Sequence, residues 1–214
     1  DPEWLGAIPG GNDLLTSLGL SDISIPEGEA SVHFIDVGQG DASLILVDGH
    51  AVLIDGGEND KGDTVVNYLK NQGVEKLDLI VTTHPHSDHA GALIEILNNP
   101  DSQITIDNVY YKFTDQEWYD THGSGRGDFV VGLRDALAKL PPEKLHGDIT
   151  KGQEIQLGDI RAVVMNDPYL LDATSVNNSS VVFKFYLNGV SILVLGDLGP
   201  EGGQLLMNEH KPAE

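Results

Sequence analysis

The amino-acid sequence predicts a layered α/β protein. Short apolar runs of the length typical of strands dominate the chain, and segments with helical spacing lie between them. Two dipeptides, Asp48-Gly49 and Asn188-Gly189, each separate two apolar runs and predict tight hairpins. With 214 residues and an apolar fraction of 40%, the chain has the size of one domain and enough apolar surface for a core.

The individual elements follow from the spacing of the apolar residues. The sequence predicts strands at residues 32–37, 42–47, 51–54, 77–82, 104–110, 154–157, 160–165, 181–187 and 190–195. It predicts helices at residues 63–71, 90–98 and 129–140, and a loop at 113–128. Gly73, Pro100 and Pro141 stand just after the three helices, where each favours a stop.

Residues 1–30 differ from the rest of the chain in composition. They are rich in Gly, Pro, Asp and Ser and have no sustained apolar period, so we expect a lead-in or linker there and a folded domain over residues 31–214. The chain starts with Asp1 rather than Met, so we expect that its original start was removed. No run approaches the roughly 18 apolar residues that a membrane-spanning helix needs.

Charge and cysteine content exclude several function classes. The formal charge of −22 excludes a broad basic face and disfavours nucleic acid as a general partner, although bound metal ions would create a local cationic site. The chain has no cysteine, which excludes disulfides, thiolate zinc sites and thiol catalysis. Together with the acidic composition and the lead-in, this favours an exported or membrane-tethered protein over a cytoplasmic one.

The most informative segment is His84-Pro85-His86-Ser87-Asp88-His89, between the strand predicted at 77–82 and the helix predicted at 90–98. Side chains at i and i+2 of an extended segment point the same way, so His84 and His86 can reach one ion. Neutral imidazole with carboxylate suits a catalytic zinc site. Asp88 and His89 follow on the next turn and can reach a second ion, about 3.5–4 Å from the first in two-metal hydrolases.

A simpler interpretation is that Ser87 or Asp88 caps the following helix. Three histidines and an aspartate within six residues, directly after a buried strand, make coincidence a poor explanation. The metal site is therefore the favoured interpretation.

This segment resembles the HxHxDH signature of the metallo-β-lactamase superfamily. Asp55-Gly56-Gly57 and Gly196-Asp197 are similar to two further motifs of that superfamily. The segments 34–41 and 177–182 resemble its ComEC-type branch, the hydrolase domain of DNA-uptake competence proteins. The resemblance covers residues 31–198 and implies an αββα sandwich.

The resemblance also implies a site for two divalent ions, zinc in the first place and manganese as the alternative. It implies that His84 and His86 bind the first ion, that Asp88 and His89 bind the second, and that Asp197 bridges both. Asp88 would also act as the catalytic residue that orients the attacking water.

Several other polar residues have two interpretations. Asp55 would support the site through hydrogen bonds to the His-rich loop, or it would only end a strand, and Asp197 has the same strand-end alternative. Asn177, Asn178 or a hydroxyl of the same segment would make a weak contact to metal or substrate. Gln39 and Asp41 lie on a Gly-rich turn that would either face the site or only make the turn.

The sequence departs from the superfamily pattern at two places. No histidine precedes Asp197 where many members have one, which is consistent with the ComEC-type branch. No His-His-Gly motif follows Asp197, and the context of His210 does not match one. We therefore expect the domain to lack its last strands and helix at the C-terminus.

The function that follows is a metal-dependent hydrolase that uses a metal-activated hydroxide. By resemblance the substrate is a phosphodiester, either nucleic acid or a phosphodiester of the cell envelope. The alternative is a metal-binding, non-catalytic module whose dinuclear site is incomplete.

Overall fold

The computed structural model describes residues 30–99, 102–122, 127–170 and 176–211. The predicted lead-in at residues 1–30 lies outside the described residues, except for Ala30, which begins the first strand. None of the helices in the described ranges is both long and apolar enough to cross a membrane.

The first sheet has six strands in the order β1-β2-β3-β5-β7-β8. Their bounds are β1 (Ala30–Phe34), β2 (Ala42–Val47), β3 (His50–Asp55), β5 (Leu79–Val81), β7 (Val109–Tyr110) and β8 (Leu145–His146). The strands β1, β2 and β3 form an antiparallel meander, whereas β3, β5, β7 and β8 run parallel. The predicted hairpin at Asp48-Gly49 is confirmed, because both residues adopt positive φ and Val47 pairs with His50.

The second sheet has four antiparallel strands in the order β12-β11-β10-β9. Their bounds are β9 (Glu154–Leu157), β10 (Ile160–Val164), β11 (Phe183–Leu187) and β12 (Val190–Val194). The predicted hairpin at Asn188-Gly189 is confirmed in the same way, with Leu187 paired to Val190. A small parallel pair is formed by β4 (Lys76–Leu77) and β6 (Thr105–Ile106).

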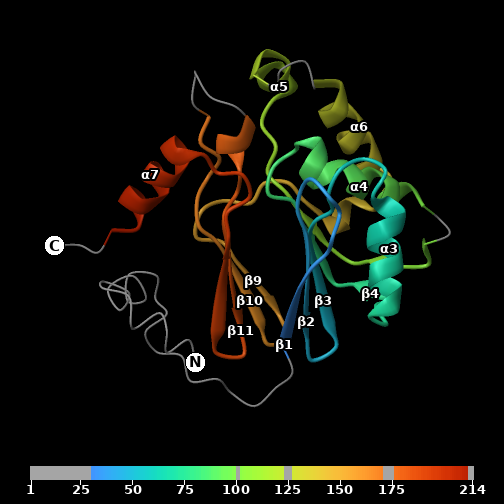
Figure 1. The fold of residues 1–214 in the computed structure, drawn as a ribbon. Helices are drawn as coiled ribbons and strands as arrows, with labels where there is room; N and C mark the ends of the chain where they lie inside the picture. The colour runs from blue at the N-terminus through green and yellow to red at the C-terminus, as the bar shows by residue number, and fades with distance from the viewer. Residues whose placement is uncertain (1–29, 100–101, 123–126, 171–175, 212–214) are drawn as a thin grey trace.

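Helices cover the outer face of the first sheet, and α7 (Pro200–Glu209) stands on the far side beside the second sheet, in agreement with the expected αββα order of layers (Figure 1). The helices on the first sheet are α3 (Gly62–Asn71), α4 (Ser87–Asn98) and α6 (Gly127–Leu137). The helix α5 (Gln116–His122) lies beside α6. Two short 3-10 helices, η2 (Pro142–Lys144) and η3 (Val176–Ser179), complete the set within the described ranges.

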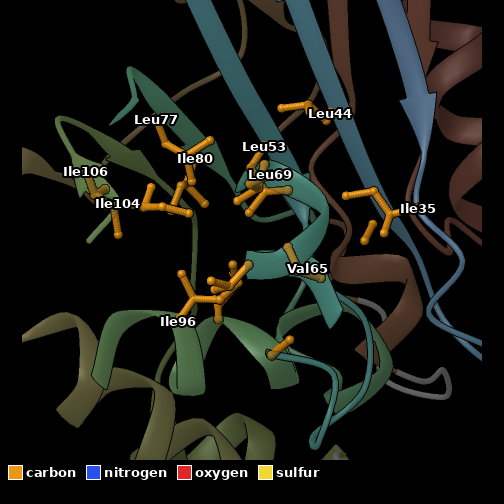
Figure 2. Packing of buried hydrophobic residues seen from close by; sticks show 14 of the residues in the cluster. Ile35, Leu44, Leu53, Val65, Leu69, Leu77, Ile80, Ile96, Ile104 and Ile106 are labelled. Carbon is orange, nitrogen blue, oxygen red and sulfur yellow. The ribbon is translucent and has the colours of Figure 1, made fainter. Parts of the chain in front are cut away.

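The alternation of side chains along the central strands creates two apolar layers. Leu44, Leu53 and Ile80 face the helices and pack with Val65, Leu69 and Ile96 (Figure 2). Their neighbours along the strands face the other way and pack against the second sheet; these are Ile45, Val52, Ile54, Leu79 and Val81, opposite Phe183 and Phe185. Since both faces of β3 and β5 are buried, these strands form a fixed platform for the residues that follow them.

Several expectations about the elements were wrong. The strand predicted at 104–110 is split into β6 and β7, which belong to different sheets. The predicted loop at 113–128 contains α5, because buried Tyr119 packs against Val130 and Val176 and gives this short segment a tertiary anchor. The predicted strand at 77–82 is interrupted at Asp78, whose carboxylate accepts the Ala51 N–H. The predicted helix at 90–98 begins three residues earlier, at Ser87.

Candidate metal centre

The predicted site residues gather where several elements end at the same edge of the sheets. Asp55 is the last residue of β3, and the His-rich segment connects β5 to α4. Because β3 and β5 are parallel, their carboxyl ends lie at one edge. Asp197 arrives there from the second sheet, three residues after β12 ends.

His84, His86 and Asp197 form the first group of candidate ligands. One nitrogen or oxygen atom from each lies within 4.8 Å of the others. His84 Nε2 and His86 Nδ1 are 3.1 Å apart. The backbone of His86 is extended, so the two imidazoles lie on the same side of the chain, as their spacing predicts.

His84 is suited to metal binding by its surroundings. It is completely buried, and burial together with the neighbouring imidazoles of His89 and His86 holds its pKa well below the usual value. A histidine that stays neutral keeps a lone pair for a cation.

Asp41, His89 and Asp197 form the second group, again within 4.8 Å. His89 Nε2 lies 3.1 Å from Asp197 Oδ1, and His89 Nδ1 lies 4.0 Å from Asp41 Oδ2. Because both groups share Asp197, they are neighbours. The sequence alone does not decide whether Asp41 faces the site, because its only indication is a Gly-rich turn before a strand.

Asp55 contacts His89 of the second group and Thr83, whose hydroxyl lies 3.2 Å from His84 Nδ1 of the first group. Its carboxylate accepts the Thr83 N–H at 2.8 Å and the Thr83 hydroxyl at 2.6 Å, and it contacts His89 Nδ1 at 3.0 Å. Asp55 has a φ of 54°, which is uncommon for a residue other than glycine. Its carboxylate fixes the ring orientation of His89, so that Nε2 faces Asp197.

His89 is strongly influenced by the carboxylates around it. Burial lowers its pKa, but the hydrogen bond and charge of Asp55, with the charges of Asp197 and Asp88, outweigh burial and raise it to about 9. Without a cation, the imidazole is therefore protonated at neutral pH and pairs with Asp55 and Asp197. A cation at Nε2 would take the place of that proton.

The turn that carries Asp197 packs closely against the first sheet. The Asp197 N–H donates to Ser180 Oγ at 3.2 Å, and the Val181 N–H donates to the Thr83 carbonyl at 2.9 Å. Gly196 has a φ of +55°, and a Cβ built on it would lie 2.8 Å from Thr83 Cβ. Only glycine allows this approach, which brings Asp197 to the histidines.

Asn178 has a structural contact that its sequence does not reveal. It is 2% exposed, and its Oδ1 accepts the N–H groups of Gly199 and Gly202 at 3.0 and 3.2 Å. The side chain therefore caps the start of α7 from a distant part of the chain. This oxygen supports the segment that follows Asp197, and a weak contact of Asn178 to metal or substrate stays a prediction.

Asp88 belongs to neither group in the part of the chain that the structure describes. It lies in the first turn of α4, and its backbone carbonyl accepts the Asp41 N–H at 3.1 Å. Ser87 is the first residue of α4, after the N-cap position at His86, and its hydroxyl donates to Glu58 Oε2 at 3.3 Å. The roles of Asp88 as ligand and as catalytic residue stay predictions.

The donor atoms of the two groups fit divalent cations. Imidazole nitrogen with carboxylate oxygen is the donor set that zinc and manganese accept, and each group offers three protein ligands. Three ligands leave room for water or substrate, which is typical of catalytic rather than structural sites.

Residues 35–213 match the Metallo-beta-lactamase superfamily. The chain belongs to this superfamily. Among curated proteins it is similar to "ComE operon protein 3" of Bacillus subtilis (strain 168), with 26% identity over 199 residues, or 84% of the chain and 24% of that protein. It is also similar to "Competence protein ComA" of Neisseria gonorrhoeae, with 23% identity over 87% of the chain and 22% of that protein. The chain thus spans about a quarter of these two relatives.

Other comparisons support the superfamily fold. "Probable metallo-hydrolase YqgX" of Bacillus subtilis is 24% identical over 77% of the chain and 68% of that protein. A Cronobacter sakazakii metallo-beta-lactamase with a HARLDQ motif aligns with a TM-score of 0.53 and 16% identity, over 87% of this chain and 68% of that one. A beta-lactamase from Chitinophaga pinensis aligns with a TM-score of 0.51 and 18% identity, over 88% and 71%. The superfamily fold supports a hydrolase with divalent metal ions.

Proposed function

We propose that this chain is a metal-dependent hydrolase that cleaves a phosphodiester. The observation that carries the proposal is the pair of ligand groups that share Asp197, with the buried Asp55 in contact with His89. When bound there, two divalent ions acidify water and neutralise the charge that develops on a phosphate. One curated relative is named a competence protein, and the resemblance of segments 34–41 and 177–182 to DNA-uptake competence proteins supports a substrate related to nucleic acid.

The residues of the chain have distinct roles in this proposal. His84 and His86 would hold the first ion and His89 the second, and Asp197, which both groups share, would supply a carboxylate to each. Asp88 lies in the first turn of α4, next to His89, where a carboxylate would orient water for attack. Asp55 and Thr83 keep His89 in the ring orientation that presents Nε2 to the site.

Hydrolysis of bis(p-nitrophenyl) phosphate with added zinc or manganese tests the proposal. The chain should release p-nitrophenolate, and His86→Ala should reduce the rate to that of the solution without protein. His33→Ala is the matched control, because His33 lies on β1 and contacts Ser31 and Tyr68 instead of the site. Its rate should equal that of the unmodified chain.

A second candidate is a metal-binding module without catalysis. The position of Asp88 outside both ligand groups favours it. Tight binding of ions without turnover of any diester would support the module and contradict the hydrolase.

A further inference from the structure

The second ligand group contains a residue that the His-rich motif does not supply. Asp41 comes from the segment between β1 and β2, almost fifty positions before His89, yet it lies with His89 and Asp197 within 4.8 Å. We propose that the Asp41 carboxylate is a ligand of the second metal ion. This inference rests on the proposed metal-dependent function.

Backbone hydrogen bonds and strand pairing hold the segment around Asp41 next to the candidate site. The Asp41 N–H donates to the Asp88 carbonyl at 3.1 Å, which attaches the segment to the first turn of α4. The next residue, Ala42, pairs with Asp55 at the end of β3. The backbone of Asp41 is therefore held on one side by Asp88 and on the other by the pairing of Ala42 with Asp55.

Glycine at position 40 makes this attachment possible. Its φ is +105°, and a Cβ built there would lie 1.9 Å from the Asp88 carbonyl oxygen. Any side chain at position 40 would push the segment away from α4. Gly38, two residues earlier, also has positive φ, but nothing lies within 4 Å of its Cβ position.

The Asp41 side chain is open to solvent and close to the second group. It is 68% exposed, whereas His89 beside it is 2% exposed, and a ligand atom of Asp41 lies within 4.8 Å of those of His89 and Asp197. A carboxylate in this place gives the second ion three protein ligands from residues 41, 89 and 197. The later histidine that the resemblance implies is not required for that number.

Manganese binding to the full chain tests the inference. Calorimetric titration of the unmodified chain should give two Mn²⁺ per chain, and electron paramagnetic resonance should show a coupled pair. Asp41→Asn should keep one ion with unchanged affinity and weaken the other by at least about ten-fold, with loss of the coupled signal. Asp48→Asn removes an equal charge from the β2–β3 turn and should leave both ions and the coupling unchanged.

A glycine pair tests the attachment separately. Gly40→Ala should weaken the same ion as Asp41→Asn, whereas Gly38→Ala introduces positive-φ strain without the contact to Asp88 and should leave it unchanged. Circular dichroism of each variant checks that the fold is retained.

The possible failures are distinguishable. If Asp41→Asn binds two ions like the unmodified chain, or loses both ions equally, Asp41 is not a ligand of one particular ion and the inference is wrong. If the unmodified chain binds no metal, the proposed function is wrong and the inference falls with it. Two coupled ions without turnover would contradict the hydrolase alone.

Discussion

At the scale of single residues, Asp55 has the most demanding position in the candidate site. It adopts positive φ, is buried, and accepts two hydrogen bonds from Thr83 while it orients His89. A strained residue persists only where its surroundings fix it, and such residues concentrate at functional sites. The strain at Asp55 thus agrees with a role in the site rather than in the turn alone.

Asp55→Asn separates these two roles. Asparagine tolerates positive φ, so the turn is retained, but its NH₂ group would face the donors of Thr83 and His89. We expect metal affinity to fall about 10–100-fold, because His89 loses the acceptor that orients it. Calorimetric titration with Zn²⁺ measures this change.

The control for Asp55→Asn is Asp48→Asn. Asp48 also has positive φ, at 48°, but lies in the β2–β3 turn at the other end of the strand. Its substitution should leave Zn²⁺ affinity unchanged. Equal affinities for the Asp55 and Asp48 variants would show that Asp55 only ends the strand.

At the scale of elements, α7 depends on a side chain from η3. The N-cap position of α7 is Gly199, which has no side chain that could accept a hydrogen bond. The Oδ1 atom of Asn178 instead accepts the N–H groups of Gly199 and Gly202. Backbone N–H groups at a helix start need an acceptor. Because α7 begins three residues after Asp197, the cap also holds the proposed bridging carboxylate.

Asn178→Ala removes the cap. We expect a loss of about 1–2 kcal/mol in the free energy of unfolding, the size typical of a lost helix cap. Amide exchange should become faster at residues 199–203, and Mn²⁺ affinity should fall as Asp197 loses its position. Asn178→Asp keeps an oxygen acceptor and should restore slow exchange; fast exchange in both variants would contradict capping.

Asp78 is a buried carboxylate directly after β4. It contacts the start of β3, and its partner Lys76 also contacts Asp107, the residue after β6. Asp78 pairs with Lys76 and accepts the Ala51 N–H at 3.0 Å, while Lys76 also lies 3.4 Å from Asp107. Burial raises the pKa of Asp78, but the hydrogen bonds from Lys76 and Ala51 and the charges of Lys76 and His50 outweigh it. The pKa is left below the ordinary value of 3.8.

The stability from Asp78 should therefore depend on pH. A lowered pKa stabilises the folded state fully above the unfolded value of 3.8, and this contribution disappears as the pH falls through the lower folded value. Asp78→Asn should cost about 1–3 kcal/mol at pH 7, and the difference from the unmodified chain should shrink towards pH 3. Urea denaturation across this range measures it.

Asp60→Asn is the comparison for Asp78→Asn. Asp60 pairs with Lys61 at 3.3 Å, but its side chain is 76% exposed, so we expect a change near zero at every pH. A difference for Asp78→Asn that grows as the pH falls would contradict the lowered pKa.

At the scale of the whole molecule, the sequence predicted what local chemistry decides. Asp48-Gly49 and Asn188-Gly189 specify their hairpins, and the spacing of His84 and His86 places both imidazoles on one side of the chain. The rest depends on contacts between distant segments. Helix α5 forms because Tyr119 packs against Val130 and Val176, and Asp41 approaches His89 because Gly40 allows contact with Asp88.

The net charge of −22 leads to a prediction about substrate length. A polyanionic strand is repelled by an acidic chain, and salt screens this repulsion, since the Debye length falls from about 30 Å at 0.01 M to about 8 Å at 0.15 M. A small diester carries one negative charge, so the acidic chain repels it much less than it repels a polyanionic strand. For this chain, the KM of a single-stranded oligonucleotide should fall as NaCl increases over this range, while that of bis(p-nitrophenyl) phosphate stays nearly constant.

The opposite salt dependence would identify a different mode of binding. A protein that holds nucleic acid through Lys and Arg releases counterions, so its affinity decreases with salt. If the KM of the oligonucleotide rises with NaCl, a cationic path must lead to the site in spite of the net charge. Steady-state kinetics with both substrates, in the same buffer and with the same metal ion, separates the two cases because the small diester corrects for any effect of salt on metal binding.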